Sequence, residues 1–303
     1  MSNFTKHTGQ NDTLMRRAAA AAVTVALILV ALKFGAWVMT GSVSLLSSLA
    51  DSTMDALASI INLLAVRHAL QPADSEHRFG HGKAEPLAGL GQAAFITGTG
   101  VYLIYEAITR LLNPKEIEHG FIGLSVMVFS IIITLVLVTY QRYVVRKTGS
   151  LAIRADSFHY ATDILVNGGV ILSLVLVMFL GWGMADPIVA LMIASFIIYS
   201  AVKIARESLD HLMDRELPDS DRKRIIELVL DHPRVIECHD LKTRAAGLNT
   251  FVQLHISMDG NMTLHEAHKV SDSVESKILS AFPNSEVIIH SDPEGITEER
   301  QEF

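Results

Sequence analysis

The sequence contains very little cysteine and little charge. Of its 303 residues one is a cysteine, Cys238, which excludes a disulfide within the chain. Charged residues make up 19% of the chain and hydrophobic residues 50%, and the mean hydropathy is +0.35. This balance is typical of a polytopic membrane protein rather than a soluble one. The polar N-terminus, up to Thr13, lacks a small-residue cleavage site, so we expect no removable signal peptide.

The few charges are unevenly distributed. Residues 1–213 carry 15 Lys and Arg against 14 Asp and Glu, whereas residues 214–303 carry 10 against 18. We therefore expect a membrane domain at residues 1–212 and an acidic, soluble domain at residues 213–303.

Six segments are apolar and long enough to cross a membrane, because a helix needs about 20 residues to span a hydrocarbon core of about 30 Å. Lys and Arg gather at the N-terminus and in the connections after the second and fourth segments, but the turns after the first and fifth segments have none. This alternation predicts that both termini are cytoplasmic. The segments are 18–40, 43–66, 87–112, 120–140, 157–181 and 186–205.

The second segment contains two carboxylates where charge is costly. Asp51 and Asp55 are four residues apart, so both point to one helix face. An ionised Asp at mid-membrane costs roughly 2.5–3.5 kcal/mol on insertion scales. A polar seam with neighbouring hydroxyl groups explains one such Asp, but it explains a pair on the same face poorly.

The fifth segment has a matching pair, His159 and Asp163, also four residues apart. At 1.5 Å per residue, Asp55 lies about 13 Å from the inner edge of the hydrocarbon core. Asp163 lies about 14 Å from Arg154, which is near the inner end of the fifth segment, so the two residues are at similar depth. The two segments run antiparallel, so all four side chains can converge. Three carboxylates and one imidazole suit Zn²⁺, with Cd²⁺ and Fe²⁺ as alternatives. The charge of the metal would offset the burial of the carboxylates.

Two further polar residues have simpler interpretations. Asp156 precedes His159 by three residues and is expected near the inner interface, as a helix-start or entry residue. Lys33 is expected to reach the membrane surface by snorkelling.

The connection after the second segment, "ADSEHRFGHGK", holds Asp74, His77 and His81. Their spacing lets one short loop surround a metal with three ligands. A solvated loop with incidental histidines explains the spacing equally well.

The acidic tail shows the pattern of a small α+β domain. "TFVQLHISM" alternates apolar and polar residues, as a half-buried strand does. The tail also holds six of the 13 histidines, which could be ordinary surface residues. An αββαβ order predicts helices on one face of a sheet. The expected elements are a helix at 219–232, strands at 235–243 and 249–258, a helix at 264–281 and a strand at 286–291.

Several long stretches make the chain similar to the cation diffusion facilitator family. They include "TGSVSLLSSLADS", "HRFGHGKAEP", "RADSFHYATDILVNGG" and "HDLKTR". The resemblance implies a homodimer of six-helix protomers, each with a cytoplasmic ferredoxin-like domain, in the bacterial inner membrane. It also implies export of Zn²⁺ or a similar ion, driven by proton entry. The implied transport site is Asp51, Asp55, His159 and Asp163.

The same resemblance implies two more metal sites. It favours metal binding by the loop residues Asp74, His77 and His81. In the tail it implies a two-metal site made of His239, His255, His268, His290 and Asp292.

Two rival functions remain open at this point: a membrane metal sensor and an intramembrane metallohydrolase. A hydrolase needs an open coordination position, but the four polar side chains of the membrane cluster are all committed as ligands. We therefore expect a transporter and not an enzyme. Its expected partners are a second copy of the chain, divalent metals, protons and membrane lipid, with no nucleic acid.

Overall fold

The computed structural model describes residues 4–41, 43–112, 121–180 and 184–295. The chain divides into two compact units, one formed by residues 9–209 and the other mainly by residues from Asp210 onward. The domain boundary expected after residue 212 stays a prediction.

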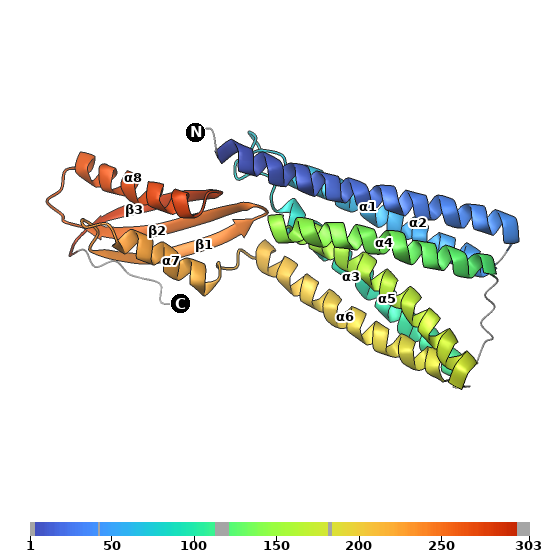
Figure 1. The fold of residues 1–303 in the computed structure, drawn as a ribbon. Coiled ribbons are helices and arrows are strands. Elements are labelled where there is room, and N and C mark those ends of the chain that lie inside the picture. Colours follow the sequence, from blue (N-terminus) through green and yellow to red (C-terminus); the bar gives the residue numbers. More distant parts are fainter. Residues whose placement is uncertain (1–3, 42, 113–120, 181–183, 296–303) are drawn as a thin grey trace. The chain divides into compact units, whose positions relative to one another are not determined.

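The first unit consists of long helices (Figure 1). They are longer than the apolar segments predicted from sequence, because polar turns extend several of them beyond the apolar run. The helices are α1 (Phe4–Thr40), α2 (Val43–Ala69), α3 (Ala84–Leu112), α4 (Phe121–Thr148), α5 (Leu151–Leu180) and α6 (Ala185–Leu212).

Five of these helices are long and apolar enough, among the residues that the structure describes, to cross a membrane: α1, α2, α3, α4 and α6. The remaining helix, α5, has 30 residues, which exceeds the roughly 20 residues needed to span a bilayer. The predicted six-helix membrane domain is confirmed.

Helix α5 occupies the centre of the unit and contacts α2, α3 and α4. Small residues allow close packing around it: Ala155 of α5 packs with Ala93 of α3 and Ala201 of α6, and Tyr160 packs with Ala22 of α1. The buried residues in the first half of α5 therefore face other helices. This packing positions His159 and Asp163 inside the unit.

The second unit has the predicted αββαβ order. Its strands lie in the order β1-β2-β3, with β1 antiparallel and β3 parallel to β2. The boundaries differ from the prediction by a few residues at β1, β3 and the end of α7. The elements are α7 (Asp219–Leu230), β1 (Glu237–Ala246), β2 (Asn249–Met258), α8 (Leu264–Ala281) and β3 (Ser285–Pro293).

The tail core lies between the sheet and its helices. Leu254 and Ile256 of β2 pack against Val229 of α7 and Val274 of α8. Because side chains alternate along a strand, His255 points to the opposite face. Helix α8 begins with a capping box, in which the Thr263 side chain accepts from the Glu266 backbone N–H and Glu266 accepts from the Thr263 backbone N–H.

Candidate metal centres

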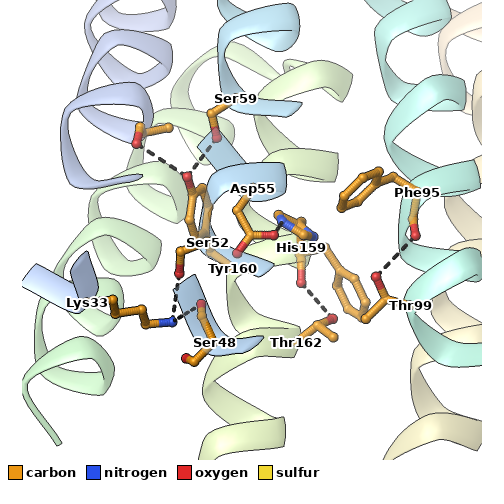
Figure 2. Close-up of polar contacts among 12 residues, drawn as sticks. Lys33, Ser48, Ser52, Asp55, Ser59, Phe95, Thr99, His159, Tyr160 and Thr162 are labelled. Carbon is orange, nitrogen blue, oxygen red and sulfur yellow. Dashed lines mark hydrogen bonds and ion pairs between the residues drawn. The ribbon is translucent and has the colours of Figure 1, made fainter. Parts of the chain in front are cut away.

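The membrane unit brings one imidazole and two carboxylates together. Each of Asp55, His159 and Asp163 offers a ligand atom within 4.8 Å of the others. The Nε2 atom of His159 lies 3.1 Å from Oδ1 of Asp55 (Figure 2). The group therefore joins α2 to α5, as the sequence predicts. One imidazole and carboxylates form a donor set that suits Zn²⁺.

The surroundings of His159 hold its ring in place. The imidazole is 1% exposed, and its centre lies 5.5 Å from the ring centres of Phe95 and Tyr160. The Tyr160 hydroxyl lies 2.7 Å from Ser59 Oγ and donates to the Ala22 carbonyl (Figure 2). Aromatic packing and this network fix α5 against α1 and α2 beside the metal-binding atoms.

The structure does not bring Asp51 into this group. Asp51 lies one turn before Asp55 on α2 and is exposed, and it is absent from the group within 4.8 Å. The sequence predicts that Asp51 and Asp55 share a helix face. It does not predict which of them lies close to His159 and Asp163 of α5. The role of Asp51 as a ligand stays a prediction.

Lys33 was expected to reach the membrane surface by snorkelling, but its side chain turns to α2 instead. Its Nζ donates to Ser52 Oγ at 2.7 Å and to the Ser48 carbonyl at 3.2 Å (Figure 2). Ser52 lies between Asp51 and Asp55 in the sequence, so the ammonium group of α1 is held beside the acidic part of α2. The physical reason is that a part-buried ammonium group needs hydrogen-bond acceptors, which these two serines supply.

Asp156 lies near the start of α5, as expected, but its side chain is buried between helices. It is 0% exposed, and Oδ2 accepts a hydrogen bond from Gln141 Nε2 of α4 at 2.6 Å. Asn62 of α2 is also buried. The sequence did not predict this burial, which arises because α4 packs against the start of α5. The expected depth of Asp156 near the inner interface stays a prediction. Gln141 and Asn62 carry no signal in the sequence beyond being polar residues in helical segments.

The loop between α2 and α3 brings its three predicted ligands together. Asp74, His77 and His81 each offer an atom within 4.8 Å of the others. Asp74 Oδ2 lies 3.3 Å from His81 Nε2, and Oδ1 lies 3.5 Å from His77 Nδ1. The backbone N–H of His77, together with that of Glu76, donates to Asp74 and lowers the pKa of its carboxyl group. The carboxylate therefore stays charged, as a metal ligand must.

Four of the five predicted tail ligands also converge. His239, His255 and His290 are direct partners on three adjacent strands. Asp292 contacts all three: Oδ2 lies 3.3 Å from His239 Nε2 and 3.0 Å from His255 Nδ1, and Oδ1 lies 3.0 Å from His290 Nε2. A carboxylate with its two oxygens on different histidines can bridge two ions.

The fifth predicted ligand, His268, lies elsewhere within the chain. Its side chain on α8 is 69% exposed and pairs with Asp272. Sequence reasoning missed Asp240, whose carboxylate lies within 4.8 Å of ligand atoms of His239 and His255. Asp240 has a positive φ of 47° at an irregularity of β1. Only the fold reveals this irregularity and the position of the carboxylate beside the two histidines.

The single cysteine, Cys238, lies next to His239 in β1. Burial raises the pKa of Cys238 to about 11, so its thiol stays protonated.

Two family models match this chain. Residues 19–213 match the cation efflux transmembrane domain, and residues 217–294 match the cytoplasmic domain of cation efflux proteins. The chain belongs to the cation efflux family. This result confirms the resemblance to cation diffusion facilitators and identifies a transporter family rather than an enzyme family.

Individual members of the cation efflux family are similar over nearly their full length. The cation-efflux pumps FieF of Salmonella arizonae and Salmonella typhimurium are each 48% identical over 280 residues, which is 92% of this chain and 93% of the relative. Two solved structures are similar to about a quarter of this chain. CzrB in its zinc form is 36% identical and covers 29% of this chain and 99% of its own, with a TM-score of 0.27. The metal-bound C-terminal domain of CzcD from Thermotoga maritima is 26% identical over 26% of this chain and 93% of its own, with a TM-score of 0.25.

Proposed function

We propose that this cation efflux protein exports Zn²⁺, with Cd²⁺ and Fe²⁺ as alternative substrates, from the cytoplasm in exchange for protons. The observation that carries the proposal is the contact of Asp55, His159 and Asp163 between two membrane helices. Buried ionisable groups within membrane segments mark ion pathways. Asp51, one turn away on α2, would join them as the fourth ligand when metal binds.

Proton exchange follows from the ligand chemistry. An imidazole and a carboxylate bind metal only when deprotonated, so a metal ion and protons compete for the same atoms. At the cytoplasmic side metal displaces protons, and at the outer side protons displace metal.

The other two groups have supporting roles in this proposal. The loop group of Asp74, His77 and His81 would hold a metal at the membrane surface. The tail group of His239, His255, His290 and Asp292 would sense cytoplasmic metal, with His268 acting from the partner in a homodimer. We infer that both termini are cytoplasmic and that the protein lies in the bacterial inner membrane, because Lys and Arg are concentrated on one side.

Flux in proteoliposomes tests the proposal. Zinc movement and internal pH would be followed together with two dyes, with and without an imposed pH gradient. We expect protons to move opposite to zinc, and acidification of the trans side to accelerate zinc transport. Zinc flux without proton movement would reject the exchange, whereas zinc binding without any flux would favour a sensor. Hydrolysis of a peptide or ester by the purified protein would favour the metallohydrolase.

A further inference from the structure

We propose that His68 is a fourth ligand of the loop metal site, which makes that site a closed structural clamp between α2 and α3. The inference rests on the loop site of the proposed function and adds a residue to it. His68 lies in the last turn of α2, six residues before the first ligand of the loop.

The contact between rings carries the inference. The ring centre of His81 lies 4.6 Å from that of His77 and also 4.6 Å from that of His68. Zinc–nitrogen bonds of about 2.0–2.1 Å place two imidazoles on one tetrahedral ion with ring centres about 5 Å apart. The distance between the ring centres of His68 and His81 is therefore close to the distance expected for two imidazoles on one zinc ion. The distance between the rings of His77 and His81 is the same.

The loop group that the structure brings together has three members, Asp74, His77 and His81. Oδ1 of Asp74 accepts hydrogen bonds from the backbone N–H groups of Glu76 and His77 at 2.9 and 2.6 Å. Oδ2, which lies beside His81, is then the atom left for a metal. One carboxylate oxygen and two imidazoles make three ligands, whereas structural zinc sites have four. Nearby Glu85 is occupied, because it accepts from the Ser150 hydroxyl and from the Ala152 N–H.

The exposure and hydrogen bonding of the two histidines are also consistent with a shared ion. His81 is 7% exposed, and its Nδ1 is buried without a hydrogen-bond partner among the described residues. The His68 side chain is exposed, so it can turn a ring nitrogen toward the ion while its backbone stays in the helix. His68 also accepts from the Gln71 N–H through its carbonyl, which fixes the turn that leads into the loop. A four-ligand site would join the end of α2 to the start of α3 and hold its metal through the transport cycle.

The test uses the full chain in detergent, with the other two sites removed by Asp55→Ala, His159→Ala, His255→Ala and Asp292→Ala. Zinc affinity is measured by competition with a chromophoric chelator, and the number of imidazole ligands by zinc X-ray absorption. We expect one ion with three imidazoles. His68→Phe keeps a ring beside His81 but no nitrogen, and should lower the affinity at least tenfold and leave two imidazoles. His68→Cys should restore tight binding with one sulfur ligand.

The outcomes separate the two levels of the proposal. Unchanged affinity in His68→Phe, or two imidazoles in the parent, would overturn the role of His68 while leaving the three-residue loop site intact. No zinc binding by the parent would overturn the loop site and the role of His68 together. Neither result bears on the transport site, which proteoliposome flux tests separately.

Discussion

The Nε2 atom of His159 on α5 lies 3.1 Å from Oδ1 of Asp55 on α2, so two membrane helices meet through a pair of candidate metal ligands. Any relative movement of α2 and α5 changes this distance. In the proposed function, such a shift would let the site bind or release an ion. The predictions below test this arrangement and the polar residues around it.

Replacement of Asp55 should be more damaging than replacement of Asp51. Asp55→Asn should abolish zinc flux in proteoliposomes, because it removes a charge from the group of three. Asp51→Asn should retain flux but raise the KM for zinc about tenfold, because Asp51 lies outside that group in the structure. The two variants are matched in chemistry and helix. Equal loss of flux in both would show that four ligands act together from the start, and unchanged flux in Asp55→Asn would refute the site.

Removal of the Lys33 charge should make the fold depend on metal. The ammonium group binds Ser52, which lies between Asp51 and Asp55 on α2, so we expect its charge to offset those of the two carboxylates in the absence of an ion. Lys33→Met should lower the melting temperature of the zinc-free protein by several degrees, and zinc should restore most of the loss. The measurement is thermal unfolding in detergent with and without zinc. Lys203→Met, at an exposed lysine of α6, is the control and should change neither curve.

The Gln141–Asp156 hydrogen bond should behave as a buried pair. Gln141→Met leaves the Asp156 carboxyl without its donor and should destabilise the protein by about 1–3 kcal/mol. The double variant Gln141→Met with Asp156→Leu removes both polar groups, so it should recover much of that stability. A double-mutant cycle on denaturant unfolding measures the coupling. Additive losses in the double variant would show that the two side chains do not depend on each other.

Zinc should stabilise the tail through the histidines of its sheet. Residues 213–303 should melt at a higher temperature with zinc than without it, because His239, His255, His290 and Asp292 would hold the ion across three strands. The gain should disappear when a chelator removes the zinc. Differential scanning calorimetry with zinc, and with zinc and chelator, gives the comparison.

The control for the tail combines His255→Ala with Asp292→Ala. This variant should melt at the same temperature with and without zinc, and the full-length form should retain some flux. An equal effect of zinc on variant and parent would place the ion elsewhere. Complete loss of flux with normal folding would show that the tail is required for transport rather than regulatory.

Hydropathy and charge in the sequence were sufficient for the architecture. Six apolar segments predicted six helices because a backbone in lipid must satisfy its own hydrogen bonds. The alternation in β2 and the αββαβ order likewise followed from local patterns. The i, i+4 spacing in α2 and in α5 placed each pair of ligands on one helix face, and the antiparallel arrangement brought Asp55 to the depth of His159.

Only the tertiary structure decided which polar residues meet. Asp51 and Asp55 lie on the same face of α2, yet only Asp55 of the two lies within the group formed with His159 and Asp163 of α5. Lys33 looked like a snorkelling residue, but Ser52 of α2 binds its ammonium group, and the sequence did not predict that Gln141 of α4 bonds Asp156. Asp240 gave only a weak signal and His68 gave none, because a β-irregularity and a ring contact depend on neighbours distant in the sequence. Local periodicity fixes the direction of a side chain along its own element, whereas its partners depend on how the elements pack.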